Sequence, residues 1–490
     1  MTSSEPVARA SLLAQPDDWG SARHRTAIGR AGLSMPARQA LEDGILEHGL
    51  SILDYGSGRG QDAARLQTLA LTVSSWDPYF ARTTAPTPHA VVLLTYVLNV
   101  IEDAAERVAT LKRAWANTQH TLVVSSRLTW DARRLHGERQ EDGVVTSRGT
   151  FQHLFSPSEL RRLVEEVTGA KCVAGAPGVI YAFRNDTDRL SMLARRAIPQ
   201  FDWTGPGDHS SALAGVVTFT ESRGRLPAFE EFPEDFRLML GSISPRELNR
   251  LVKLAANPDI VAQGARRSTL DTLLYLGTEL FNGRGPYSSL PLAIQLNVRR
   301  FFSSYREASQ RSDRLLLKLR DEAYVRGAMR NSVGKMTPSA LYVHRDACHL
   351  MPVVLRLYEH CGSIAAGRIS DFTLVKLSHD RTAVSWLGYP EFDSDPHPRT
   401  AWSYQVSLPD FETRYQDFTT RSNRPLLHRK EEFIGRDDPR RAKFERLTRA
   451  EVKAGLYARP HLIGTEDGWS GELARCGVAL KGHRLVQHHG

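Results

Sequence analysis

The chain has 490 residues, 41% hydrophobic and 24% charged, so its length accommodates two to four domains with buried cores. The 64 lysines and arginines exceed the 55 acidic residues, which permits nucleic-acid binding without demonstrating it. No apolar run approaches 18 residues, and the amino terminus lacks a basic stretch followed by an apolar one, so neither a membrane partner nor export is expected. Four scattered cysteines fit a reducing cytoplasm.

The first distinctive pattern lies between residues 34 and 71. Ser34 followed by Pro36 is typical of a helix start. A short apolar run, 51–53, then ends in Asp54, and a helix-like segment begins at Gln61. Between them, glycines at alternate positions predict a tight turn that lets the backbone approach a ligand; they are Gly56, Gly58 and Gly60.

A second apolar run, 71–76, ends in Asp77, 23 residues after Asp54. An acid at this distance beyond a glycine turn is placed to accept hydrogen bonds from ribose hydroxyls. Two nucleotide-type cofactors fit such a unit, and a glycine turn of another doubly wound protein is the alternative. The order D-x-G-x-G-x-G differs from the dinucleotide pattern G-x-G-x-x-G and favours S-adenosyl-L-methionine.

The following segments alternate between apolar strands and amphipathic helices, which indicates an α/β fold with a doubly wound parallel sheet. Strands are expected at 90–96 and 120–126, helices at 102–116 and 157–169, and a closing pair of strands at 171–174 and 178–183. Only 12 residues separate Asp77 from Ala90, too few for a further helix, strand and helix, so the sheet is expected to lack these additional elements.

The chain divides into four expected parts. Residues 1–45 form an amino-terminal helical lead segment, and 46–187 form the methyl-donor-binding domain. Residues 188–335 are mainly helical, judging from the periodic segments 247–255, 268–281 and 290–318. Residues 336–490 alternate aromatic, proline-rich and strand-like pieces, which suggests an α+β domain suited to nucleic-acid recognition.

The chemistry is narrowed by what the sequence lacks. Methylation of a cytosine carbon uses a thiolate, usually from a Pro-Cys pair, and no cysteine here follows proline. The strand 90–96 also lacks the Pro-Pro-aromatic tip typical of exocyclic-nitrogen methylation. Methyl transfer by proximity remains, with Tyr96, Asn99 and Glu102 as candidate catalytic residues near the strand's exit. Helix capping is the alternative role for Asn99 and Glu102.

Two polar clusters lie in the last third. His344, Cys348, His349, His360 and Cys361 match no common zinc module, and a helix over 347–361 would separate the two ends, so no metal site is expected. His428, Arg429 and Lys430 precede Glu431. Two adjacent cations suit a backbone oxyanion and predict a phosphate or DNA clamp, and an ion-paired turn is the alternative.

Several strings resemble the DNA phosphorothioation-associated methyltransferases, bacterial proteins encoded near the systems that replace a DNA phosphate oxygen by sulfur. The strings that carry the resemblance are His24-Arg25-Thr26-Ala27, Leu53-Asp54-Tyr55-Gly56, Trp76-Asp77-Pro78, Val97-Leu98-Asn99-Val100-Ile101-Glu102-Asp103, Gly149-Thr150-Phe151-Gln152, Leu341-Tyr342-Val343-His344-Arg345 and Leu427-His428-Arg429-Lys430-Glu431. Ser57, where many relatives have cysteine, and Arg424, where a proline is usual, depart from the pattern.

The resemblance implies a class I methyltransferase-type sheet, S-adenosyl-L-methionine as the cofactor, and DNA, including phosphorothioate-modified DNA, as a partner. It also implies protein partners within a DNA modification or defence system. It leaves the acceptor atom open. A non-catalytic, donor-binding regulatory or assembly component and an RNA methyltransferase are the alternatives.

Overall fold

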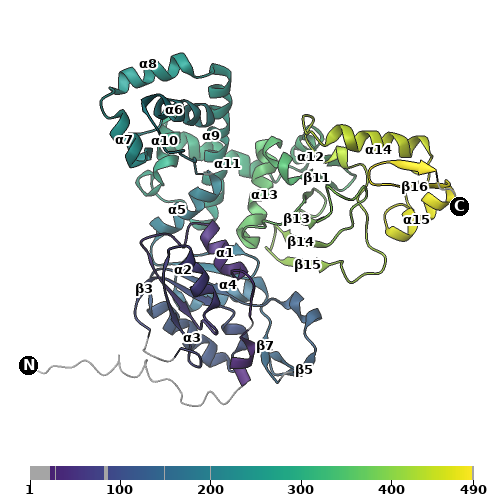
Figure 1. Cartoon of the computed structure of the whole chain (residues 1–490), viewed down its shortest axis with the longest axis horizontal. Coiled ribbons are helices and arrows are strands. Elements are labelled where there is room, and N and C mark those ends of the chain that lie inside the picture. Colours follow the sequence, from purple (N-terminus) through teal and green to yellow (C-terminus); the bar gives the residue numbers. More distant parts are fainter. Residues whose placement is uncertain (1–21, 28, 82–85, 148, 199, 488–490) are drawn as a thin grey trace, which may run out of the picture. The chain divides into compact units, whose positions relative to one another are not determined.

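The structure is a computed structural model that describes residues 22–27, 29–81, 86–147, 149–198 and 200–487 (Figure 1). Residues 1–21 of the predicted lead segment therefore lie outside the described part. Two compact units are present. The first contains the described residues up to Asp188, Tyr342–Arg345 and the chain from Gly362 onward, and the second contains Arg189–Leu341 and Asp346–Cys361. No helix in the described ranges has the length and apolar character needed to cross a membrane.

The first sheet has six strands in the order β2-β1-β3-β4-β9-β8. The four strands that come first in the chain pair in parallel, whereas β9 runs antiparallel to both β4 and β8. The predicted doubly wound α/β sheet is thus confirmed. The strands are β1 (Ser51–Tyr55), β2 (Thr72–Trp76), β3 (His89–Thr95), β4 (Thr118–Ser125), β8 (Cys172–Ala176) and β9 (Val179–Phe183).

The described sheet has no additional strand between β2 and β3 in the chain, as expected, and β2 lies at its edge. Its core forms where apolar side chains of successive strands, such as Leu53, Val92 and Leu122, meet the helices. The helices of this part are α1 (Met35–Glu42), α2 (Gln61–Thr68), α3 (Ala104–Ala116) and α4 (Pro157–Thr168).

Local sequence explains where these helices begin. Ser34 Oγ accepts from the backbone N–H of Ala37 at the start of α1, as the Ser-x-Pro pattern predicts. Ser156 and Glu159 form a reciprocal capping box at α4. Asp103, and not Asn99, caps α3 by accepting from the N–H of Ala105.

A small antiparallel sheet follows β4 and was not predicted. It consists of β5 (Gly137–Gln140), β6 (Gly143–Thr146) and β7 (Phe151–His153). Its strands are only three or four residues long, too short for an alternating pattern to stand out in the sequence.

The second unit is largely helical, and its long predicted helix over 290–318 is broken. Phe302 ends one helix, and Ser304 begins the next by accepting from the N–H of Glu307, so a local cap interrupts the periodic pattern. The helices are α5 (Asp186–Ala197), α6 (His209–Arg223), α7 (Glu234–Leu240), α8 (Pro245–Ala255), α9 (Pro258–Glu279), α10 (Leu292–Phe301), α11 (Tyr305–Lys318) and α12 (Glu322–Arg330).

The carboxyl-terminal part contains the antiparallel ladder β12-β13-β14-β15, which Figure 1 draws in green. The helix expected over 347–361 is instead a 3₁₀ turn, Arg345–Leu350, followed by α13 after Pro352. The elements here are β10 (Lys335–Met336), β11 (Ala340–His344), α13 (Val353–Ala366), β12 (Leu374–Ser378), β13 (Ala383–Gly388), β14 (Trp402–Ser407), β15 (Thr413–Asp417), α14 (Arg441–Lys453), α15 (Glu466–Arg475), β16 (Val478–Leu480) and β17 (Leu485–Gln487).

Candidate active site

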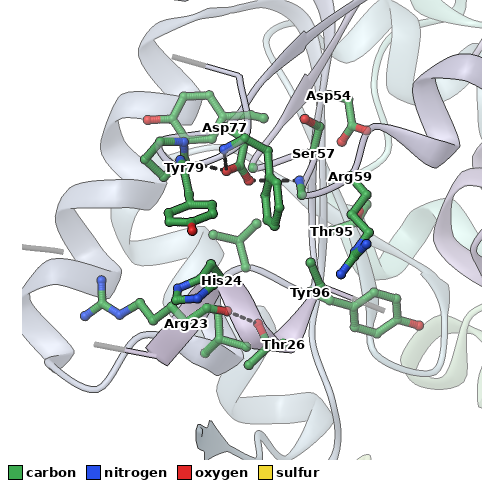
Figure 2. Close-up of a pocket in the computed structure, with 18 of the residues that line it drawn as sticks. Arg23, His24, Thr26, Asp54, Ser57, Arg59, Asp77, Tyr79, Thr95 and Tyr96 are labelled. Carbon is green, nitrogen blue, oxygen red and sulfur yellow. Dashed lines mark hydrogen bonds between the residues drawn. The ribbon is translucent and has the colours of Figure 1, made fainter. Parts of the chain in front are cut away.

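A cavity of about 170 Å³ opens at the carboxyl ends of β1, β2 and β3, where ligands of doubly wound sheets bind. Its wall combines the glycine turn after β1, the segment Asp77–Phe80 after β2 and the exit of β3 at Tyr96. The short helical turn Ala22–Thr26 closes the remaining side. Figure 2 shows the rings of His24 and Tyr79 facing each other, with the Tyr96 ring turned away from them.

The glycine turn has the conformation that its sequence predicts. Gly56, Gly58 and Gly60 have φ angles of +79°, +53° and +69°. A side chain at Gly56 would place its Cβ 2.5 Å from a methyl carbon of Val97, and one at Gly58 would come within 3.2 Å of the Cβ of Ala27. The turn therefore needs glycine for both its backbone angles and its close packing.

Asp77 shapes the loop as well as facing the cavity. Its Oδ2 accepts from the N–H of Gly58 at 2.8 Å, and its Oδ1 accepts from the N–H groups of Tyr79 and Phe80 at 2.8 and 2.9 Å. Figure 2 marks these bonds with dashed lines. A carboxylate offers about four acceptor positions, so roughly one remains for a ligand hydroxyl.

Asp54 is 3% exposed, and no hydrogen bond from a described residue reaches its carboxylate, although it lines the cavity. Burial, reinforced by the nearby charges of Asp62 and Asp77, raises the pKa of Asp54 to about 7, against the opposing effect of Arg30. A buried acid held in this way gains stability when a cation approaches it. The Asp54 carboxyl is therefore suited to a positively charged ligand group.

Glu102 acts on the cavity through an arginine. Arg23 Nε donates to Glu102 Oε2 at 2.6 Å, and the two terminal nitrogens of Arg23 donate to Glu106 at 2.6 and 2.7 Å. Arg23 itself lines the cavity. Glu102 and Glu106 thus orient this guanidinium, and neither of them caps a helix.

Tyr96 stands in a rare backbone conformation at the exit of β3. Its φ of +58° is unusual for a bulky residue, and such strain is often retained at functional positions. The Tyr96 N–H donates to the carbonyl oxygen of Ser125 at 3.0 Å, which helps to hold this geometry. The Arg30 guanidinium lies 5.1 Å from the ring centre. Burial raises the pKa of the phenol, so it is neutral at physiological pH.

Asn99 lies apart from the cavity wall. It is 2% exposed, and its Nδ2 donates to Oε1 of Gln152 on β7 at 3.0 Å. This bond ties the exit of β3 to the small sheet that the sequence did not reveal. A direct role for Asn99 in catalysis stays a prediction from the sequence.

Of the predicted clamp residues in the carboxyl-terminal part, Lys430 is the most buried. Lys430 is 2% exposed, and its Nζ donates to the carbonyl oxygens of Phe392 and Asp395, both at 2.6 Å, and lies 2.8 Å from Nε2 of His483. Burial, together with the Lys443 cation, lowers the pKa of Lys430 to about 7. These internal contacts leave Lys430 no donor to offer to a phosphate.

The two neighbours of Lys430 are only partly buried. His428 Nε2 lies 2.6 Å from the carbonyl oxygen of Ile463. Arg429 keeps a partly exposed guanidinium, which lies 3.4 Å from Glu432 and 4.5 Å from the ring centre of Tyr457. His428 and Lys430 contact internal carbonyl oxygens, whereas Arg429 stays partly exposed beside Glu432, so a phosphate contact by this segment stays a prediction from the sequence.

Several residues of the cavity wall escaped the sequence argument. Arg23 and Arg30 belong to no motif, and the acids that hold Arg23 follow about 80 residues later. His24 belongs to one of the strings that carry the resemblance, but its stacking on Tyr79, with ring centres 4.3 Å apart, was not predicted. Complementary charge between Arg23 and the Glu102–Glu106 pair was the available signal, but it identifies no contact without the tertiary structure.

No protein-family model and no curated protein sequence matches the chain. Similar solved structures include the CcbJ methyltransferase from Streptomyces caelestis, with 15% identity, 33% of this chain and 93% of that chain covered, and a TM-score of 0.24. An S-adenosylmethionine-dependent methyltransferase from Methanosarcina mazei has 15% identity, coverages of 29% and 94%, and a TM-score of 0.23. The 1,6-didemethyltoxoflavin-N1-methyltransferase from Burkholderia thailandensis, solved with S-adenosylhomocysteine, has 17% identity, coverages of 38% and 93%, and a TM-score of 0.21.

The first sheet has the class I methyltransferase fold. This follows from its strand order, with four parallel strands and a closing antiparallel pair, and from the glycine turn after β1.

Proposed function

We propose that the cavity binds S-adenosyl-L-methionine and that the protein transfers its methyl group to a nucleic acid, with DNA as the expected substrate. The observation that carries the donor assignment is the pair of acids at the ends of β1 and β2. Asp54 presents a carboxyl with no hydrogen-bond donor among the described residues, and Asp77 keeps about one acceptor position. A cationic group and a ribose hydroxyl match these two acids.

Further features of the wall fit the same ligand. Ser57 Oγ is buried at the cavity with no hydrogen-bond partner in the described chain, so a bound molecule would satisfy it. The stacked rings of His24 and Tyr79 offer an apolar face next to Asp77. The positive φ angles of the glycine turn leave the backbone open to close approach.

The donor supplies an already activated methyl group, so the protein's task is to orient the acceptor and exclude water. The surroundings do not favour a covalent route through cysteine. Burial raises the pKa of both Cys172 and Cys361 to about 12, and neither lines the cavity. Tyr96, neutral and placed at the cavity edge, is the side chain best positioned to contact an acceptor.

The positive balance of the chain, +9, supports a nucleic acid as the acceptor, and the family resemblance extends the proposal to DNA in a phosphorothioation or defence setting. The test has two parts. Calorimetry with S-adenosyl-L-methionine and with S-adenosylhomocysteine measures binding, and radiolabelled transfer is followed in parallel to DNA, phosphorothioate DNA and RNA. Donor binding without any labelled product would favour the alternative function, a donor-binding regulatory or assembly component without catalytic activity. Absence of donor binding would refute the proposal.

A further inference from the structure

A second, larger cavity of about 620 Å³ lies within the first compact unit. Its wall includes the segment after β4, from Ser126 to Arg133, and the loop between β8 and β9 at Ala176 and Pro177. Strands β14 and β15 supply the opposite side through Trp402, Tyr404 and Tyr415. The volume is within the range of small-molecule sites.

Tyr96 connects this space to the donor cavity, because it lines both of them. Its left-handed backbone conformation places it at the exit of β3, between the two. A group held in the larger cavity would therefore meet the side chain that borders the methyl-donor site.

Aromatic rings dominate one wall of the larger cavity. Trp130 stacks on Tyr415, with ring centres 5.5 Å apart and an angle of 30° between the planes, and meets Tyr404 edge-on at 5.6 Å. Trp402 stacks on Tyr415 at 6.5 Å and 22°. Trp130, Trp402 and Tyr415 are only partly buried, so part of their surface remains available to a planar ligand.

Two arginines at this cavity are placed to contact an anion. Arg38 and Arg133 are exposed, and neither has an acidic partner among the residues that the structure describes. Two of the lining acids are already engaged, since Asp131 accepts from the N–H of Leu128 at 3.1 Å and Asp417 accepts from the N–H of Thr419 at 2.8 Å. Arg368 and Asp371 also line the cavity, so its three arginines and three acids balance in formal charge, and binding of an anion would depend on Arg38 and Arg133.

A buried hydroxyl also faces the cavity without a partner. Ser126 is 4% exposed, it lines the cavity, and no described residue forms a hydrogen bond with its Oγ. Buried polar atoms are normally satisfied, so this hydroxyl indicates that a polar ligand group or water completes the site.

We propose that this cavity holds the methyl acceptor as a single unstacked base of a nucleic acid, with the base on the Trp130–Tyr415–Trp402 wall and the flanking phosphates near Arg38 and Arg133. The inference rests on the proposed methyl transfer and assigns the acceptor site that the donor cavity lacks. Base stacking on aromatic rings, phosphate contacts to arginine and a polar atom that reads a base edge are the three recognition elements of single-stranded binding.

The test uses the full chain and fluorescein-labelled oligonucleotides of about 12 nucleotides, as single-stranded DNA, single-stranded RNA and perfectly paired duplex. Anisotropy at several salt concentrations gives the affinity and its salt slope. Wild type should prefer single strands to duplex, because a base must leave the stack before it can enter the cavity.

Two variants separate stacking from charge. Trp130→Ala should weaken single-strand binding by about 5- to 150-fold and leave the salt slope unchanged, because stacking is worth about 1–3 kcal/mol per base. Arg38→Ala with Arg133→Ala should reduce the salt slope by about 1.4, since each phosphate contact on a single strand contributes about 0.7. Both arginines are exposed, so this second variant tests the proposal even if Trp130→Ala unfolds the protein.

A double variant of two exposed arginines outside the cavity, Arg162→Ala with Arg436→Ala, is the matched control and should bind like wild type. Calorimetry of S-adenosyl-L-methionine binding to every variant distinguishes failure of the proposed acceptor site from failure of the proposed donor site. Normal donor binding, together with oligonucleotide affinity that neither cavity variant changes, overturns the acceptor site and leaves the donor site standing. Oligonucleotide binding that depends on the cavity residues, without donor binding, refutes the proposed function and keeps the nucleic-acid site.

Discussion

Binding of S-adenosyl-L-methionine should tighten as the pH rises through about 7, because the donor's cationic group is expected to bind the ionised Asp54 carboxyl. The pKa of Asp54 is about 7 in the free protein, chiefly through burial. A bound cation lowers this pKa, so binding releases a proton. If the protonated form binds negligibly, the ionised fraction limits the affinity, and the contribution of Asp54 alone should fall about tenfold between pH 8 and pH 6.

The α-amino group of the donor also titrates, with a pKa near 8, and loses its positive charge above that pH. Wild-type affinity should therefore peak between about pH 7 and pH 8. Asp54→Asn is the matched control: it keeps the size of the side chain, removes its charge, and should retain only the ligand's decline at high pH.

Calorimetry in two buffers of different ionisation enthalpy measures the released proton directly. At pH 7, roughly half a proton should come from Asp54, because the group is half-ionised there. A flat affinity profile from pH 6 to 7.5, or an identical profile for Asp54→Asn, would refute the assignment of Asp54 to the donor's cation.

The raised pKa of Asp54 also predicts an effect on stability. Because burial raises the pKa in the folded protein above its unfolded value, ionised Asp54 destabilises the fold. Asp54→Asn should therefore melt at a higher temperature than wild type at pH 8, and the difference should shrink toward pH 4. Equal melting shifts at both pH values would contradict this. Asp77→Ala should weaken donor binding at least about tenfold in calorimetry, since it removes the ribose acceptor and the three bonds that shape the loop. Gly58→Val should abolish donor binding, because position 58 has a φ of +53° and a side chain there would contact Ala27. Normal donor binding by this variant would show that the donor does not bind at the glycine turn. Tyr96→Ala should reduce the rate of methyl transfer far more than donor affinity, and an equal loss in both would argue against contact with the acceptor. Lys430→Ala should lower the melting temperature, because the Phe392 and Asp395 carbonyls lose their hydrogen-bond donor. A loss of DNA affinity with an unchanged melting temperature would instead support a phosphate-binding role for Lys430.

The carboxyl-terminal hairpin around β16 and β17 should loosen in acid. Burial and the neighbouring Lys430 cation lower the pKa of His483 to about 4 in the folded chain. The unfolded chain takes up a proton at higher pH, so the stability contributed by neutral His483 is complete above about pH 6.5 and is lost as the pH falls through about 4. Hydrogen exchange of residues 478–487 across this range measures the effect, and His483→Gln should remove much of the pH dependence.

Local signals were sufficient for most of the first sheet. The strands β1 to β4, the helices α3 and α4 and the closing strand pair all appear near their predicted ranges, because each element is long enough to show its apolar period and carries its own caps or glycines. The glycine turn, with Asp54 and Asp77 at the ends of their strands, was readable for the same reason. These features depend on residues within about 25 positions of one another.

Other features depended on contacts between distant residues. Arg23 reaches the donor cavity because Glu102 and Glu106 hold it, and Trp130 meets Tyr404 and Tyr415 only after β14 and β15 have formed their ladder. Likewise, Lys430 reads as a surface cation in the sequence, yet carbonyl groups from 35 and 38 residues away enclose its ammonium group. The sequence alone determined the strands, the turn and the two acids, since their propensities act locally. Burial, ion pairing and the walls of both cavities were decided only by tertiary structure, because they depend on which distant segments pack together.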